Sequence, residues 1–293
     1  MRVLRLTVQY DGTDLGGFQR QARSGQPTVQ GLLEQALSEL LGHPTRVVGA
    51  GRTDAGVHAL GQVVHLRTHS PIPAERIPGA LNRRLPAAIR VVAAEQAGQR
   101  FHARRDATSR IYCYHVLNRP QGSAFAERYA WWVPEPLDVA PMERLARRIA
   151  GRRDFGAFGS PLKKGQPTVR TVFAARLDQA AVPGGGRVLR LCVEADGFLY
   201  RMVRLLAGAL VRVGLGRLPE QAVVDALEGL SPGSATGGQA GGRLAPAAPA
   251  AGVCLVHVNY SGHPAGLELC GGVLDTLCGL WLECPRGSNG WPG

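Results

Sequence analysis

The chain lacks any long apolar segment. Its 293 residues contain no run of 18 or more apolar residues, the length that a membrane-spanning helix needs. The first ten residues alternate charged and apolar side chains and contain no apolar core of a secretory signal. These absences argue against membrane insertion and export, so we expect a cytoplasmic protein. The length fits one large domain or two ordinary ones.

Cysteine and histidine are not arranged for metal binding. The six cysteines form no CxxC pair and no Cys/His cluster with zinc spacing, so we predict no bound metal. In a reducing compartment we expect all six cysteines to be thiols. They are Cys113, Cys192, Cys254, Cys270, Cys278 and Cys284.

The phosphate-binding loops of nucleotide cofactors are also missing. No P-loop sequence occurs in the chain. Gly49-Ala50-Gly51 lacks the third glycine and the following helix of a dinucleotide-binding loop. The sequence therefore predicts no nucleotide cofactor.

Lysine is almost absent, and arginine supplies the positive charge. Only Lys163 and Lys164 are lysines among 34 basic residues, and 22 acidic residues leave a net charge of +12. A GC-rich codon bias can produce such an excess of arginine without functional meaning. A strongly basic chain otherwise favours a polyanionic partner, because guanidinium binds phosphate through a bidentate fork. Nucleic acid is the leading partner class.

Apolar residues recur at strand and helix spacings in two similar halves. Alternating positions predict strands, and a one-sided spacing predicts helices. We expect strands at about 4–10, 46–48, 62–67, 89–93, 110–117, 168–177, 187–195 and 254–260, and helices at about 29–41, 80–84, 141–149, 198–213 and 219–229. This order predicts an α+β fold of two subdomains, 1–104 and 105–260, each an antiparallel sheet flanked by helices.

The densest polar cluster is the glycine-flanked loop 51–58, which contains Arg52 and Asp54. An aspartate in such a loop commonly caps the backbone amides of a turn. A carboxylate beside an arginine could equally be a nucleophile held ionised by its neighbour. Spacing alone does not decide between these two readings.

Four sequence blocks carry a resemblance to a known family. Residues 49–59 (GAGRTDAGVHA), followed by Gly61-Gln62-Val63-Val64, resemble the signature of the tRNA pseudouridine synthase A (TruA) family. Three further blocks are similar to that family's motifs in the expected order: 10–21, 101–114 and 198–204. The resemblance covers about residues 5 to 260. One departure is Phe18, where tryptophan is usual, which keeps an aromatic face but loses an indole N–H donor.

The resemblance implies both a fold and an activity. The activity is an isomerisation of uridine to pseudouridine in the anticodon stem-loop, at positions 38, 39 and 40 of tRNA. The fold is the pseudouridine synthase fold, with the active-site cleft between the two subdomains. The family needs no cofactor and works as a homodimer, with tRNA lying across both subunits.

The resemblance also assigns roles to single residues. Asp54 would be the catalytic nucleophile, and Arg204 would pair with its carboxylate. Tyr112 would stack on the target base and could take a proton from C5. Arg52 would enter the stem and help to displace the target nucleotide.

Other residues are assigned from the sequence pattern alone. Arg104 and Arg110 belong to a strip of arginines that could follow the RNA backbone, so both are candidates for substrate binding. His58 could pack against its loop or touch RNA, and packing is favoured. Asp11 could lie near the site or merely cap its turn. Residues 261–293 match nothing in the family, and we expect a poorly ordered tail.

The chemistry fits these residue types. A carboxylate can attack C1′ of uridine, or stabilise an electron-poor sugar while the N1–C1′ bond breaks, as in glycosidases. Attack at C6 of the base and a glycal route both remain open. A bidentate arginine at Arg204 would keep the Asp54 carboxylate ionised and oriented. Extruding the base costs a few kcal/mol, and stacking on Tyr112 offsets about 1–3 kcal/mol of that cost.

Two other function classes remain open. A catalytically inactive tRNA-binding protein would bind the same substrate but would not need Asp54. A ribosyl hydrolase would use the same carboxylate at C1′ but would release free uracil and leave an abasic tRNA.

Overall fold

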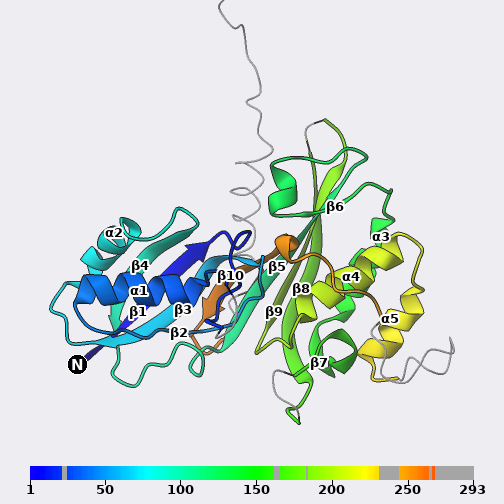
Figure 1. Ribbon diagram of the computed structural model, residues 1–293. Coiled ribbons are helices and arrows are strands. Elements are labelled where there is room, and N and C mark those ends of the chain that lie inside the picture. The colour runs from blue at the N-terminus through cyan, green and yellow to red at the C-terminus, as the bar shows by residue number, and fades with distance from the viewer. Residues whose placement is uncertain (22–24, 162–164, 183, 231–243, 264–265, 268–293) are drawn as a thin grey trace, which may run out of the picture.

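The computed structural model describes residues 1–21, 25–161, 165–182, 184–230, 244–263 and 266–267 (Figure 1). The strands are β1 (Arg2–Tyr10), β2 (Val48–Gly49), β3 (His58–Thr68), β4 (Ile89–Ala97), β5 (Ser109–Asn118), β6 (Trp131–Val133), β7 (Gly151–Asp154), β8 (Val169–Ala181), β9 (Arg187–Ala195) and β10 (Val253–Asn259). The α-helices are α1 (Val29–Leu41), α2 (Ile77–Asn82), α3 (Val139–Arg148), α4 (Met202–Gly214) and α5 (Glu220–Leu227). In these described ranges no helix is long and apolar enough to cross a membrane.

The ten strands of the described residues join one mostly antiparallel sheet. The order is β4-β1-β3-β10-β5-β9-β8-β7, with β2 beside β3 and β6 beside β5. The C-terminal strand β10 lies between the two halves: it pairs in parallel with β3 and antiparallel with β5. Figure 1 shows α1 and α2 beside the N-terminal strands and α3, α4 and α5 beside the C-terminal ones. The α+β class is confirmed, and the division of the chain at residue 104 stays a prediction.

Helix α1 forms where its apolar spacing predicts it. The Thr28 side chain caps its start by accepting a hydrogen bond from Gly31 N, and Gly42 ends it with a φ of 72°. The face that α1 buries consists of Val29, Leu33, Ala36, Leu37 and Leu41. This stripe packs α1 into the main hydrophobic core.

The helix predicted from residue 198 begins later, at Met202. Arg201, the residue before it, has left-handed backbone angles, so the preceding segment cannot continue the helix. Tyr200 instead forms an isolated antiparallel bridge with Ser160. The apolar spacing of 198–203 suggested a helix, because the left-handed backbone of Arg201 leaves no sign in that spacing.

The prediction of reduced thiols is wrong for two of the six cysteines. Cys113 and Cys192 lie directly opposite each other in the β5–β9 ladder and form a disulfide. They are 79 residues apart, so the local sequence spacing does not predict this disulfide. Cys254 is buried on the neighbouring strand β10, opposite Cys113.

The chain beyond Tyr260 lies mostly outside the described residues, so the expectation of a poorly ordered tail is not tested there. Its described part contacts the sheet. Gly266 N donates to Glu194 Oε2 at 3.0 Å, and Leu267 packs against Ile111 and Cys113.

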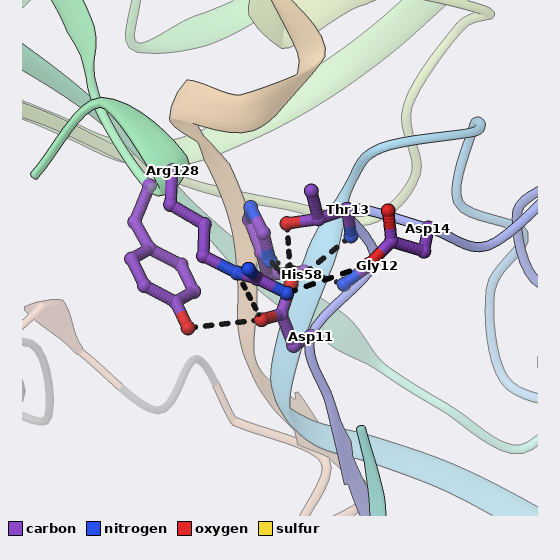
Figure 2. A network of polar contacts seen from close by, with 7 residues as sticks. Asp11, Gly12, Thr13, Asp14, His58 and Arg128 are labelled. Atoms are coloured by element: carbon purple, nitrogen blue, oxygen red, sulfur yellow. Dashed lines mark hydrogen bonds and ion pairs between the residues drawn. The ribbon is translucent and has the colours of Figure 1, made fainter. Parts of the chain in front are cut away.

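A polar network around Asp11 connects the two halves of the chain (Figure 2). Asp11 Oδ2 accepts from Arg128 Nε at 2.7 Å and from Tyr129 Oη at 2.9 Å, while Oδ1 accepts from Thr13 N at 3.0 Å. Partial burial alone would raise the pKa of Asp11, but these hydrogen bonds outweigh burial and lower it to about 2. The carboxylate therefore ties the end of β1 to the segment before β6.

His58 completes this network as a buried, packed side chain. Its Nδ1 accepts from Gly12 N at 3.1 Å, and its ring lies 4.8 Å from that of Tyr129. Burial lowers the pKa of His58, although the Asp11 carboxylate, whose Oδ1 lies 3.3 Å from Nδ1, acts in the opposite direction. His58 therefore packs inside the protein, and the alternative of an RNA contact is not tested.

We expect Asp11→Asn to lower the free energy of unfolding by about 1–3 kcal/mol at neutral pH, the usual range for hydrogen bonds to a charged group. The ionised carboxylate stabilises the fold above the unfolded-chain pKa of about 4, and this contribution is lost as the pH falls through about 2. The difference between variant and parent should therefore shrink below about pH 4.

Denaturant unfolding of both proteins at neutral pH and in acid measures this difference. Asp14→Asn is the matched control, because the Asp14 side chain is 87% exposed and 3.6 Å from Arg128 Nη2. Its effect should stay below about 0.5 kcal/mol. A deficit of Asp11→Asn that does not change with pH would contradict the assignment.

Candidate active site

One cleft of about 780 Å³ is lined by both halves of the chain. Its walls come from the loop that contains Asp54, from β5, and from the segment that leads into α4. These segments are far apart in sequence and meet because β10 joins β3 to β5. Of the residues assigned from the sequence, Asp54, Tyr112, Arg204, Arg52, Arg104 and Arg110 all line this cleft.

Asp54 and Arg204 form an ion pair across the cleft. Arg204 Nη1 lies 3.3 Å from Asp54 Oδ2, and the two side chains are 17% and 25% exposed. Arg204 Nε donates instead to the carbonyl oxygen of Ala248 at 2.7 Å. The expected bidentate pair is therefore not formed. Because Nε is engaged with the backbone, the guanidinium bridges the carboxylate and the segment before β10.

Buried polar side chains hold the loop on both sides of Asp54. Tyr10 Oη and Thr53 Oγ1 share a hydrogen bond of 2.8 Å. Gln62, which is fully buried in β3, donates from Nε2 to Gly51 O at 3.2 Å. Side chains of β1 and β3 thus fix Thr53 and Gly51, so the loop that carries Asp54 is anchored to the sheet.

The loop at residues 16–18 supports the same turn from the other side. Phe18 N donates to Thr53 O at 3.0 Å. Gly17 has a φ of 87°, and a Cβ there would lie 2.7 Å from Thr53 O, so the close approach needs glycine. The Phe18 ring is buried, and a Cβ on Gly49 would come within 2.5 Å of it. An aromatic ring at Phe18 is therefore part of the packing of this loop.

Tyr112 lies on β5 with its ring at the wall of the cleft. It is 9% exposed, and its ring meets that of Phe198 edge-on at 4.8 Å. Burial raises the pKa of Tyr112 well above the usual range, and nearby Tyr10 and Asp54 act in the same direction. The phenol is therefore neutral at physiological pH, which suits a stacking surface.

Arg52 and Arg104 concentrate positive charge at the cleft. Both are exposed and both line it. Partial burial lowers the pKa of Arg52, and the positive charge of Arg104 lowers it further. Two guanidinium groups that repel each other in this way favour an anion between or beside them.

Arg110 has a different environment from the one expected for an RNA contact. Its Nη2 donates to Ala50 O at 3.1 Å and to Arg104 O at 2.7 Å, and its Nη1 donates to Ala107 O and Asp196 O. Four backbone carbonyls therefore occupy the guanidinium. Arg110 connects the loop before Asp54 with two other loops of the cleft, which makes it a positioning residue.

The sequence interpretation did not single out Gln62, Phe198 and Asp196. Gln62 stands inside the signature block but carries no charge, and only the fold shows that its amide reaches Gly51. Phe198 stands in the block at residues 198–204 and was assigned to the helix predicted over 198–213, which begins only at Met202. Asp196 lines the same cleft, and its Oδ1 accepts from Thr171 N at 3.1 Å. An Asp-Gly pair after a strand usually signals only a turn.

The part of the chain that the structure describes contains no group of three or more His, Cys, Asp or Glu side chains placed to hold a metal ion. The reactive side chains that line the cleft are carboxylates, guanidinium groups and phenols.

Comparison with known proteins places these features in a family. A family profile described as tRNA pseudouridine synthase matches residues 6–106 and 145–261. The chain is 40% identical over 263 residues to tRNA pseudouridine synthase A of Moorella thermoacetica, a match covering 89% of this chain and 100% of that protein. It is 41% identical over 261 residues to tRNA pseudouridine synthase A of Thermus thermophilus, covering 89% of this chain and 97% of that protein. The chain belongs to the tRNA pseudouridine synthase family.

Proposed function

We propose that this protein is an isomerase that converts uridine to pseudouridine in tRNA, with Asp54 as its nucleophile. The single observation that carries the proposal is the carboxylate of Asp54, fixed on a held loop and paired with Arg204 in a cleft rich in arginine. The family and the relatives named tRNA pseudouridine synthase A support the reaction.

The isomerisation exchanges one bond to the ribose for another. The N1–C1′ bond breaks, the uracil turns, C5 bonds to C1′, C5 loses its proton and N1 gains one. Asp54 can attack C1′ or C6, or stabilise the electron-poor sugar, because its carboxylate is oriented in the cleft by the Arg204 guanidinium. In each route Arg204 holds the carboxylate in place through the second contact with Ala248.

The target nucleotide has to leave its stack before the carboxylate can reach it. Tyr112 presents a ring at the cleft wall, and base–aromatic stacking contributes about 1–3 kcal/mol per base. Extrusion of a base from a helix costs a few kcal/mol, so stacking on Tyr112 offsets much of this cost. Arg52, two residues before Asp54, is exposed and can occupy the vacated space.

The substrate site is proposed to be the anticodon stem-loop, at positions 38, 39 and 40 of tRNA. The motifs at residues 49–59 and 198–204 support this assignment by their similarity to the family. The same resemblance leads us to propose a homodimer in the cytoplasm, with tRNA lying across both subunits. A catalytically inactive tRNA-binding protein is not supported, since the family and the relatives are named as synthases.

Asp54→Asn should abolish pseudouridine formation, with a loss of about 10³-fold or more in kcat, because an amide cannot act as the nucleophile. Binding of unmodified tRNA should persist, since the arginines of the cleft are untouched. The measurement is pseudouridine content of an unmodified tRNA transcript after incubation, read by mass spectrometry. Asp196→Asn is the matched control: it removes a second carboxylate from the same cleft and should lose far less activity.

Undiminished turnover by Asp54→Asn would refute the proposed nucleophile. Free uracil and an abasic tRNA, formed by the parent protein in the same assay, would instead identify a ribosyl hydrolase.

Arg204→Lys should lower kcat by about 10–100-fold with little change in KM. An ammonium group keeps the charge, but it cannot contact Asp54 and Ala248 O with two fixed N–H groups. Steady-state kinetics on tRNA separate the two constants. A rise in KM with unchanged kcat would show that Arg204 binds RNA rather than positioning the carboxylate.

A further inference from the structure

Arg201 combines a strained backbone with a place on the wall of the cleft. Among the described residues it is the only non-glycine residue with a positive φ, at 62°. This left-handed conformation is unfavourable for any residue with a Cβ. A positive side chain is also unfavourable at the start of a helix, and Arg201 immediately precedes α4. Strain of this kind is retained where the residue has another role.

The side chain of Arg201 is stacked on a neighbouring ring. Its Cζ atom lies 4.9 Å from the centroid of the Tyr200 ring. Tyr200 N donates to Ser160 O at 2.9 Å, which fixes the backbone beneath the ring. Tyr200 is 38% exposed, and both residues line the cleft that holds Asp54. A flat cation is thus held in place by an aromatic ring and faces the substrate site.

The Nε atom of Arg201 is buried and has no hydrogen-bond partner among the described residues. The two aspartates of the described cleft wall have other contacts. Asp54 pairs with Arg204, and Asp196 accepts a hydrogen bond from Thr171 N. The positive charge of Arg201 is therefore added to that of Arg52 and Arg104 at the same cleft.

We propose that Arg201, held flat by Tyr200, binds a backbone phosphate of the RNA strand next to the extruded nucleotide. A guanidinium donates two parallel N–H bonds to phosphate oxygens, and with Nε of Arg201 buried the donors for them are on Nη1 and Nη2. The left-handed backbone brings the side chain of Arg201 back over Tyr200 before α4 begins. The inference rests on the proposed function, because it names a substrate contact of the same site.

A purely structural role makes a different prediction about tRNA binding. If Arg201 only closed the turn before α4, glycine would adopt its φ without strain and would serve better. If Arg201 binds phosphate, glycine relieves the strain but removes the contact. Stability and substrate binding should then change in opposite directions, as expected where a strained site serves function.

The test compares Arg201→Gly with Arg152→Ala, an exposed arginine of β7 outside the cleft. Each change is made in the parent protein and in Asp54→Asn, where binding can be measured without turnover. The readouts are Kd for unmodified tRNA at several salt concentrations, KM and kcat for pseudouridine formation, and Tm.

Arg201→Gly should raise Kd and KM about 5–50-fold and reduce the slope of log Kd against log salt by about 1, as for the loss of one phosphate contact. Its Tm should equal or exceed that of the parent. Arg152→Ala should change Kd by less than about 2-fold. Unchanged Kd and salt slope in Arg201→Gly would overturn the proposal, and so would a fall in Tm that accompanies weaker binding. Failure of the parent protein to form pseudouridine would instead refute the proposed function.

Tyr200 provides an independent arm of the same test. Tyr200→Ala removes the ring and should raise Kd, while Tyr200→Phe keeps the ring and should bind tRNA more tightly than Tyr200→Ala. Equal Kd values for these two variants would show that the stacked geometry does not matter for binding.

Discussion

The ion pair between Asp54 and Arg204 joins residues 150 positions apart, and the rest of the site is organised around it. The pair forms where β10 joins the two halves of the sheet. β3 starts directly after the Asp54 loop, and the segment before β10 carries Ala248, which accepts from Arg204. β10 thus sets the distance between the Asp54 carboxylate and the Arg204 guanidinium. Any displacement of β10 would separate both from Tyr112 on β5.

The arginines of the cleft fall into two groups with different partners. Arg110 and Arg204 donate to backbone carbonyls, so much of their hydrogen-bonding capacity is used to hold loops together. Arg52 and Arg104 are exposed, and Arg201 is stacked on a ring rather than paired with a carboxylate. The first group makes the cleft rigid, and the second leaves it positively charged. A polyanion relieves the repulsion in the second group without disturbing the first.

The sequence predicted what depends on local spacing. α1 and β5 appear where apolar periodicity and capping residues place them. β7 was missed because Gly151–Asp154 shows no apolar alternation, and the Cys113–Cys192 disulfide was missed because strand register created it. Asp54 was ambiguous by spacing, and only the family resemblance favoured it as the nucleophile. The backbone contacts of Arg110 could not be predicted, because the carbonyls that it binds come from loops far apart in the sequence.

Stacking and proton transfer place opposite demands on Tyr112. An aromatic ring stacks best when it is shielded from water, and the burial that shields Tyr112 also raises the pKa of its phenol. A neutral phenol is not a base: it can receive the C5 proton only if it releases its own in the same step. Tyr10, whose pKa burial also raises, already shares its hydroxyl with Thr53. The arrangement therefore favours Tyr112 as a stacking surface for the uracil ring, with Asp54 supplying the negative charge that the reaction needs.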